Sequence, residues 1–166
     1  MTKEAILDFS RAHAEPDWLR ERRLKAYDVI EELALPKIER VKFHRWNLGD
    51  GTISDSPLSA NVPDFTALGD NPKLVQVGTQ TILEQMPSEL SEKGVVFTDL
   101  ASALDEIPEV IEAAFGSAAS YDEDKLAAYH TAYFNSAAVL YVPDNVEVET
   151  VVEGIFYQDS DSDTPF

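Results

Sequence analysis

Val139-Leu140-Tyr141-Val142 and, further along, Ile155-Phe156-Tyr157 are the two segments that decide the predicted fold. Both are short runs of β-branched and aromatic residues bounded by Pro143-Asp144-Asn145 and Gly154, which is typical of strands separated by corners. The alternation suits a coil of stacked rungs, although two partial rungs do not establish a repeat, which needs three or more units. Since a sheet edge left at residue 166 has to be covered, we predict a longer polypeptide.

The region before these strands, residues 37–136, is predicted to be a mixed α/β region. Helical spacing extends from residue 99 to residue 114, and Pro108 divides it into two short helices, the second of which Gly116 ends. A further helix is predicted from Asp122 to Asn135, with an acidic first turn. Strands are predicted at residues 74–77, 79–85 and 95–97, whereas residues 38–46 are expected to be either an extended connector or an edge strand, and residues 54–63 to form a loop.

Two helices are predicted in residues 1–36, the first over residues 3–13. The second begins with Pro16 in its first turn and continues to Ala34, because Pro36 stops it. The chain therefore reads as an α+β protein with three parts, an N-terminal helical segment (1–36), an α/β region (37–136) and the start of a truncated coil of strands (137–166).

Two arginines lie within the apolar arc of the second helix. At 100° per residue, Arg22 and Arg23 fall among side chains such as Leu19 and Ala26, so each must extend outward or meet an acidic partner. Arg22 also follows Trp18 by four residues, a spacing that permits a cation–π contact. Two interpretations stay open for Trp18, Arg22 and Arg23: local packing with ion pairing, or contact with a partner protein.

Composition excludes several classes of function. The chain has no cysteine, which excludes disulfides, thiolate catalysis and cysteine-ligated clusters within this segment. The net charge is −18, and residues 47–166 hold three bases against 22 acids, so binding to nucleic acid or to an anionic membrane surface is not expected. No apolar run has the length of a secretion signal or of a membrane helix, and we expect a cytoplasmic protein.

The sequence predicts no catalytic, cofactor-binding or metal-binding residues. His13, His44 and His130 do not occur at ligand spacing, and His130 is expected to be a core or interface residue. The acidic run 159–163 resembles the opening of a calcium loop but lacks its glycine and final glutamate. Motifs for phosphate binding and nucleophilic catalysis are also absent. An independent acidic adaptor and a hydrolase with a carboxylate metal site remain as alternatives.

Three stretches resemble the SufB/SufD family of iron–sulfur cluster assembly proteins. Residues 15–19, Glu-Pro-Asp-Trp-Leu, followed by Arg-Leu-Lys-Ala at 23–26, are similar to an N-terminal signature shared by SufB and SufD. Leu-Ala-Leu-Pro at 33–36 and the segment 42–48 resemble SufD more than SufB. The segments 133–136, 139–143 and 146–149 resemble the region where the β-helix of that family begins.

This resemblance implies that residues 137–166 are the first turns of a right-handed parallel β-helix. It also implies an accessory and scaffold subunit of a cytoplasmic SufBCD complex, which pairs with SufB, binds the SufC ATPase through C-terminal helices and acts by protein contact. The iron–sulfur cluster would be assembled by the full complex. The reactive cysteine of the family belongs to SufB and its assisting histidine lies late in SufD, so the resemblance places no catalytic or metal residue in residues 1–166.

Overall fold

The computed structural model describes residues 2–43, 53, 62–65 and 69–157, which form two compact units. The first unit contains the described residues up to 53 together with residues 108–135. The second contains residues 62–65, 69–107 and 136–157. Each unit is therefore built from segments that are distant in the sequence, and each is described by itself.

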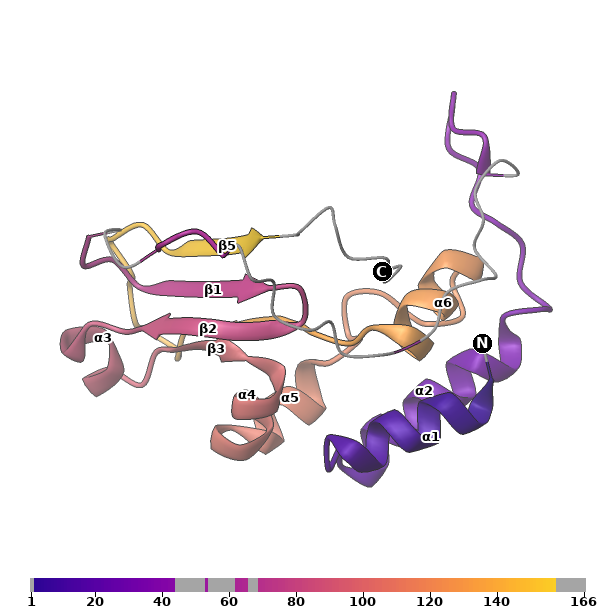
Figure 1. Ribbon diagram of the computed structural model, residues 1–166, viewed down its shortest axis with the longest axis horizontal. Helices are drawn as coiled ribbons and strands as arrows, with labels where there is room; N and C mark the ends of the chain where they lie inside the picture. Colours follow the sequence, from indigo (N-terminus) through magenta and orange to yellow (C-terminus); the bar gives the residue numbers. More distant parts are fainter. Residues whose placement is uncertain (1, 44–52, 54–61, 66–68, 158–166) are drawn as a thin grey trace. The chain divides into compact units, whose positions relative to one another are not determined.

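The first unit is helical. Its elements are α1 (Lys3–Ala12), α2 (Asp17–Val29), α5 (Pro108–Ala114) and α6 (Lys125–Tyr133) (Figure 1). Side chains cap two of these helices, because Thr2 accepts a hydrogen bond from the N–H of Ala5 and Asp124 accepts one from the N–H of Ala127. Pro16 directly precedes α2, where its missing N–H costs no helical hydrogen bond.

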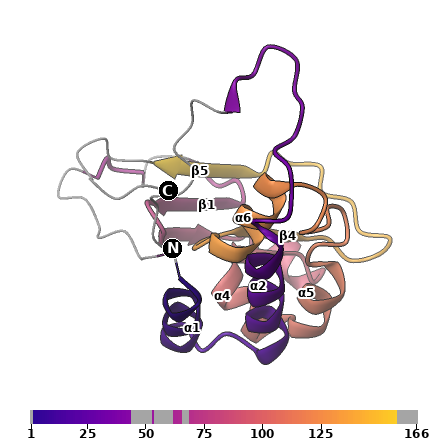
Figure 2. The ribbon, with the colours of Figure 1, turned by 90° about the vertical axis from the view of Figure 1, so that its right-hand side faces the viewer.

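Small residues form the contact between α2 and α6. Ala26, Ala128 and Ala132 are fully buried in one cluster with Ile6 and Ile30. Methyl side chains let two helix backbones approach closely, so small residues suit this contact. Figure 2 shows α1 and α2 side by side. The segment after α2 is also fastened to α6, since the N–H of Lys125 donates to the carbonyl of Ala34 at 3.0 Å.

The second unit holds two small sheets and two short helices. The elements are β1 (Lys73–Val77), β2 (Gln80–Gln85), α3 (Ser88–Glu92), β3 (Val96–Asp99), α4 (Leu100–Glu106), β4 (Ala138–Tyr141) and β5 (Glu153–Tyr157). The three-stranded sheet has the order β2-β1-β5, with β1 and β2 antiparallel and β1 and β5 parallel (Figure 1). The two-stranded sheet pairs β3 with β4 in antiparallel fashion.

An ion pair of a buried lysine with a partly exposed glutamate joins β1 and β5. Lys73 lies opposite Glu153, and its Nζ is 3.6 Å from a carboxylate oxygen of Glu153. The same Nζ donates to the carbonyl of Gly69 at 2.6 Å, so this lysine, which is 1% exposed, is well satisfied. Because a slip of one residue would leave the buried ammonium without its carboxylate, the pair opposes other registers.

The α+β class and most of the predicted elements are confirmed, but several bounds differ. The helix predicted to continue to Ala34 ends at Val29, and α6 begins at Lys125 because Asp124 is its cap instead of part of an acidic first turn. Residues 38–43 form no strand. The rest of the predicted 38–46 segment, most of the 54–63 loop and the acidic run 159–163 lie outside the described residues.

The predicted coil of strands differs from the observed pairing. β4 and β5 lie in different sheets, β4 beside β3 and β5 beside β1, so the described residues show no coils of a right-handed parallel β-helix. The short strands themselves are confirmed at both positions. The three-part division at residues 36 and 136 stays a prediction.

Candidate functional site

The residues predicted to contact a partner lie on α2, where the structure gives Arg23 a buried position. Both nitrogens of one guanidinium edge bind Glu15, with Nε 2.9 Å from Oε2 and Nη2 2.6 Å from Oε1. Nη1 donates to the carbonyl of Phe134 at 2.7 Å, and the guanidinium carbon lies 3.7 Å from the centre of the Phe134 ring. The Arg23 side chain is only 1% exposed, so it is not a surface group. Its hydrogen bond to Phe134 holds the segment that follows α6.

Arg22 has a different environment, half-buried at the end of α5. Its Nη2 donates to the carbonyl of Gly116 at 3.2 Å, and its guanidinium lies over the rings of Phe115 and Tyr121, at 5.7 and 5.8 Å, instead of over Trp18. Its Nε is buried and has no hydrogen-bond partner. In the part of the chain that the structure describes, no carboxylate forms an ion pair with Arg22.

The path of the chain after α5 makes room for Arg22. Gly116 has a φ of +71°, which is favourable for glycine, and a Cβ at this position would collide with the guanidinium of Arg22. Trp18 lies on the same side of α2, with its ring 5.9 Å from that of Phe115 in an edge-on arrangement. The side chain of Arg22 therefore packs against Phe115 and Gly116, and a larger residue at position 116 would displace it.

A groove opens beside Arg22 within the first unit, with a volume of about 540 Å³. We call it the Arg22 groove. His130, predicted to be a core or interface residue, is exposed and lies along the groove, so its placement in the core is wrong, while an interface role stays a prediction. Its walls are mainly apolar or small, and they include Phe115, Ala119, Leu126 and Ala127. Asp124, the cap of α6, also lines it.

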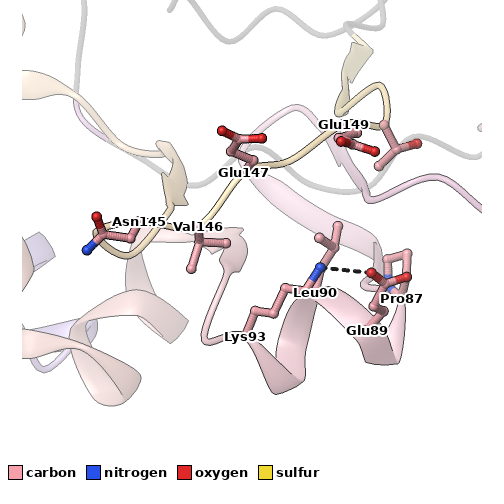
Figure 3. A pocket seen from close by; sticks show the side chains of 9 residues that line it. Pro87, Glu89, Leu90, Lys93, Asn145, Val146, Glu147 and Glu149 are labelled. Carbon is pink, nitrogen blue, oxygen red and sulfur yellow. Dashed lines mark hydrogen bonds and ion pairs between the residues drawn. The ribbon is translucent and has the colours of Figure 1, made fainter.

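A second, open cavity of about 910 Å³ lies in the second unit, between α3 and the segment before β5 (Figure 3). Lys93 donates to Glu89 at 2.8 Å, and this hydrogen bond lowers the pKa of Glu89 and raises that of Lys93. Glu147 and Glu149 also line this cavity, which makes it acidic. Because Glu89 and Lys93 already satisfy one another on the surface, the cavity presents no unpaired charge from α3.

Within the described ranges, no three His, Asp or Glu side chains lie close enough together to hold a metal ion. Among the helices that the structure describes, none combines the length and apolar character needed to cross a membrane.

Sequence reasoning identified Trp18 and Arg22 but missed their neighbours. Phe115 and Gly116 follow α5, and only the fold brings them to α2, more than ninety residues earlier in the chain. The one available signal was Gly116 itself, which was correctly predicted to end the second of the two helices. Contact of Trp18, Arg22 and Arg23 with a partner stays a prediction, and the burial of Arg23 leaves Trp18 and Arg22 as the groups nearer the surface.

Comparison with known proteins gives the family. Residues 70–153, just over half of the chain, match the family described as SufBD protein N-terminal region. The chain is 35% identical to the iron-sulfur cluster assembly protein SufD of Bacillus subtilis, over 99% of this chain and 40% of that protein. It is 27% identical to an iron-sulfur cluster assembly SufBD family protein of Staphylococcus haemolyticus, over 98% of this chain and 39% of that protein.

The chain therefore belongs to the SufBD family, and it matches the N-terminal region of that family. It is similar to the SufD protein of Bacillus subtilis along nearly its whole length. The chain spans about 40% of the length of the curated relatives that it matches. The resemblance found in the sequence is thereby confirmed.

Proposed function

We propose that this chain is the N-terminal part of a SufD-type accessory and scaffold subunit that supports iron–sulfur cluster assembly through protein contact. The observation that carries the proposal is the match to Bacillus subtilis SufD at 35% identity over 99% of the chain. The family match over residues 70–153 supports it independently of the signature at the N-terminus. In this proposal the iron–sulfur cluster is the product that the full complex assembles, and this segment provides no residue that binds it.

The proposed partners are SufB and the SufC ATPase, in a cytoplasmic complex. What supports contact as the mode of action is the nature of the Arg22 groove, which combines apolar walls with an arginine that has no carboxylate partner among the described residues. Such a surface is suited to binding, because aromatic groups and arginine contribute strongly to protein interfaces. We propose that Trp18 and Arg22 contact the partner and that the buried Arg23 keeps α2 in place beneath this contact.

We further propose that β4 and β5 lead into a right-handed parallel β-helix in the longer protein. β5 is the outer strand of its described sheet, beside β1, so one edge is available for another strand. Phe156, at 64% exposure, lies on this strand and would be covered by such an addition.

The test uses the full-length protein and a strain that lacks its gene. We expect the deletion to lower the activity of iron–sulfur enzymes, and the full-length gene to restore it. We also expect the purified full-length protein to co-purify with SufB and SufC. Normal iron–sulfur enzyme activity in the deletion strain, together with no co-purification, would contradict the proposal.

The alternative of a hydrolase with a carboxylate metal site is separated by a thermal shift assay with magnesium, calcium and manganese. A ligand that binds only the folded state raises its stability, by about 2.7 kcal/mol at a hundred times its dissociation constant. The scaffold proposal predicts no shift at sub-millimolar metal. A saturable shift with one of these ions would favour the hydrolase.

A further inference from the structure

We propose that the Arg22 groove binds a short segment of a partner protein that carries one carboxylate flanked by apolar side chains. The carboxylate pairs with Arg22, and a neighbouring apolar side chain packs against Leu126 and Ala127. This inference rests on the proposed action by protein contact, and it specifies the chemistry of the partner at this site.

The first argument is charge complementarity. The three other arginines of α1 and α2 have carboxylate partners, since Arg11 pairs with Asp8 at 3.0 Å, Arg20 with Asp17 at 2.7 Å and Arg23 with Glu15 at 2.6 Å. Arg22 has none among the described residues, and because its Nε is buried, a partner would have to approach the outer Nη nitrogens of the guanidinium. A half-buried guanidinium is best satisfied by a carboxylate, which accepts charge-assisted hydrogen bonds. An acidic side chain from a partner segment would supply such a carboxylate.

The second argument is preorganisation. Arg22 is already held by the carbonyl of Gly116 and by the rings of Phe115 and Tyr121. A side chain that is fixed before binding loses little rotamer entropy when the partner arrives, so its contact retains more of its free energy. The same contacts hold the guanidinium at the lining of the groove.

The third argument concerns the walls and their size. Ala119 and Ala127 leave space, Leu126 supplies apolar surface, and a volume of about 540 Å³ is enough for a few side chains but not for a folded domain. Asp124 lines the same groove, so a second acid would be repelled. These features favour a segment with one carboxylate among apolar residues over a run of acids or a free phosphate. The net charge favours a different protein over a second copy of this chain, because two chains of net charge −18 repel one another.

The experiment measures the binding of two short fluorescein-labelled peptides to the full-length protein by fluorescence anisotropy. One peptide has an aspartate between two leucines, and its twin has asparagine at that position. We expect the aspartate peptide to bind about tenfold more tightly, as a charge-assisted hydrogen bond would give. Arg22→Gln should remove this difference, whereas Arg20→Gln, on the same helix but paired with Asp17, should leave it unchanged.

A second pair of variants leaves Arg22 in place. Ala119→Glu introduces a carboxylate at the groove and should lower the affinity for the aspartate peptide about tenfold, while Ala113→Glu, exposed on α5 and outside the groove lining, should not. Equal binding of both peptides, no effect of Arg22→Gln and Ala119→Glu, or full displacement of the peptide by millimolar inorganic phosphate would overturn this inference. Retained co-purification with SufB and SufC would then show that the proposed function survives without it.

Discussion

Arg22 and Arg23 are neighbours in the sequence, yet they serve different parts of the first unit. Successive residues of a helix point about 100° apart, so one arginine is directed toward the end of α5 and the other toward the exit of α6. Arg23 finds a carboxylate and two carbonyls, while Arg22 finds one carbonyl and two aromatic rings. The sequence predicted that both needed partners, but the partners on α5 and α6 are too distant in the chain for periodicity to reveal.

Replacing Arg23 with alanine should destabilise the protein strongly. The change leaves the Glu15 carboxylate buried, at 6% exposure, without its cation, and breaking such a pair costs about 3–5 kcal/mol. Urea unfolding followed by circular dichroism measures the loss. Arg20→Ala is the control, because its ion pair with Asp17 is on the surface and should contribute about 0.2–1 kcal/mol. Equal losses for the two variants would contradict the buried role of Arg23.

Replacing Gly116 with alanine should cost more than replacing Gly69. Both glycines have a positive φ, +71° and +55°, so both substitutions carry backbone strain of about 1–3 kcal/mol. A Cβ at Gly69 meets nothing within 4 Å, whereas one at Gly116 collides with Arg22. We therefore expect the unfolding midpoint of Gly116→Ala to be the lower, and the added Arg22→Ala change to recover part of the difference. Additive effects of these two changes would argue against the contact.

Alkaline pH should destabilise the protein through Tyr133. Burial raises the pKa of this phenol, and the nearby Tyr27 and Tyr129 raise it further. The unfolded chain ionises at about pH 10, so the stability present below that pH is lost as pH rises from about 10 toward the higher folded-state pKa. Urea unfolding between pH 8 and 11 should show this decline, and Tyr133→Phe should lessen it. An identical decline in both proteins would exclude Tyr133 as the cause.

At the scale of the elements, the sequence predicted where helices begin better than it predicted where they end or which elements pack together. Pro16 and Pro108 correctly indicated where α2 begins and where α4 is separated from α5. The sequence analysis placed His130 of α6 in the core or an interface, but the buried residues of this helix are alanines, because close approach to α2 favours small side chains over large ones. The pairing of β1 with β5, about eighty residues apart, could not be predicted, since alternating apolar residues do not specify which strand lies beside them.

Enlarging Ala128 tests the contact between α2 and α6. Ala128 is 0% exposed in the core cluster, so Ala128→Leu adds three carbons to a buried contact and should cost about 1–3 kcal/mol. Ala113→Leu, at an exposed position of α5, should change the free energy of unfolding by less than about 0.5 kcal/mol. Chemical denaturation measures both. A neutral Ala128→Leu substitution would mean that the helices are more loosely packed than the structure shows.

The chain as a whole carries far more negative charge than its ion pairs use. With 31 acids and 13 lysines and arginines, many carboxylates have no cation available. Exposed acids such as Glu106, Glu109 and Glu112 follow one another closely on α4 and α5. Like charges held together in a compact state repel more strongly than in an extended chain, so the net charge opposes folding while it favours solubility.

Salt should therefore stabilise the folded state. Raising NaCl from 0.01 M to 0.1 M shortens the screening length from about 30 Å to about 10 Å, which weakens repulsion across the molecule more than it weakens close ion pairs. We expect the urea midpoint to rise over this range. The triple variant Glu106→Gln, Glu109→Gln, Glu112→Gln should be more stable than the parent at 0.01 M and should respond less to salt, because it starts with a smaller net charge. A midpoint that falls with salt would instead show that surface ion pairs such as Arg20–Asp17 outweigh the repulsion.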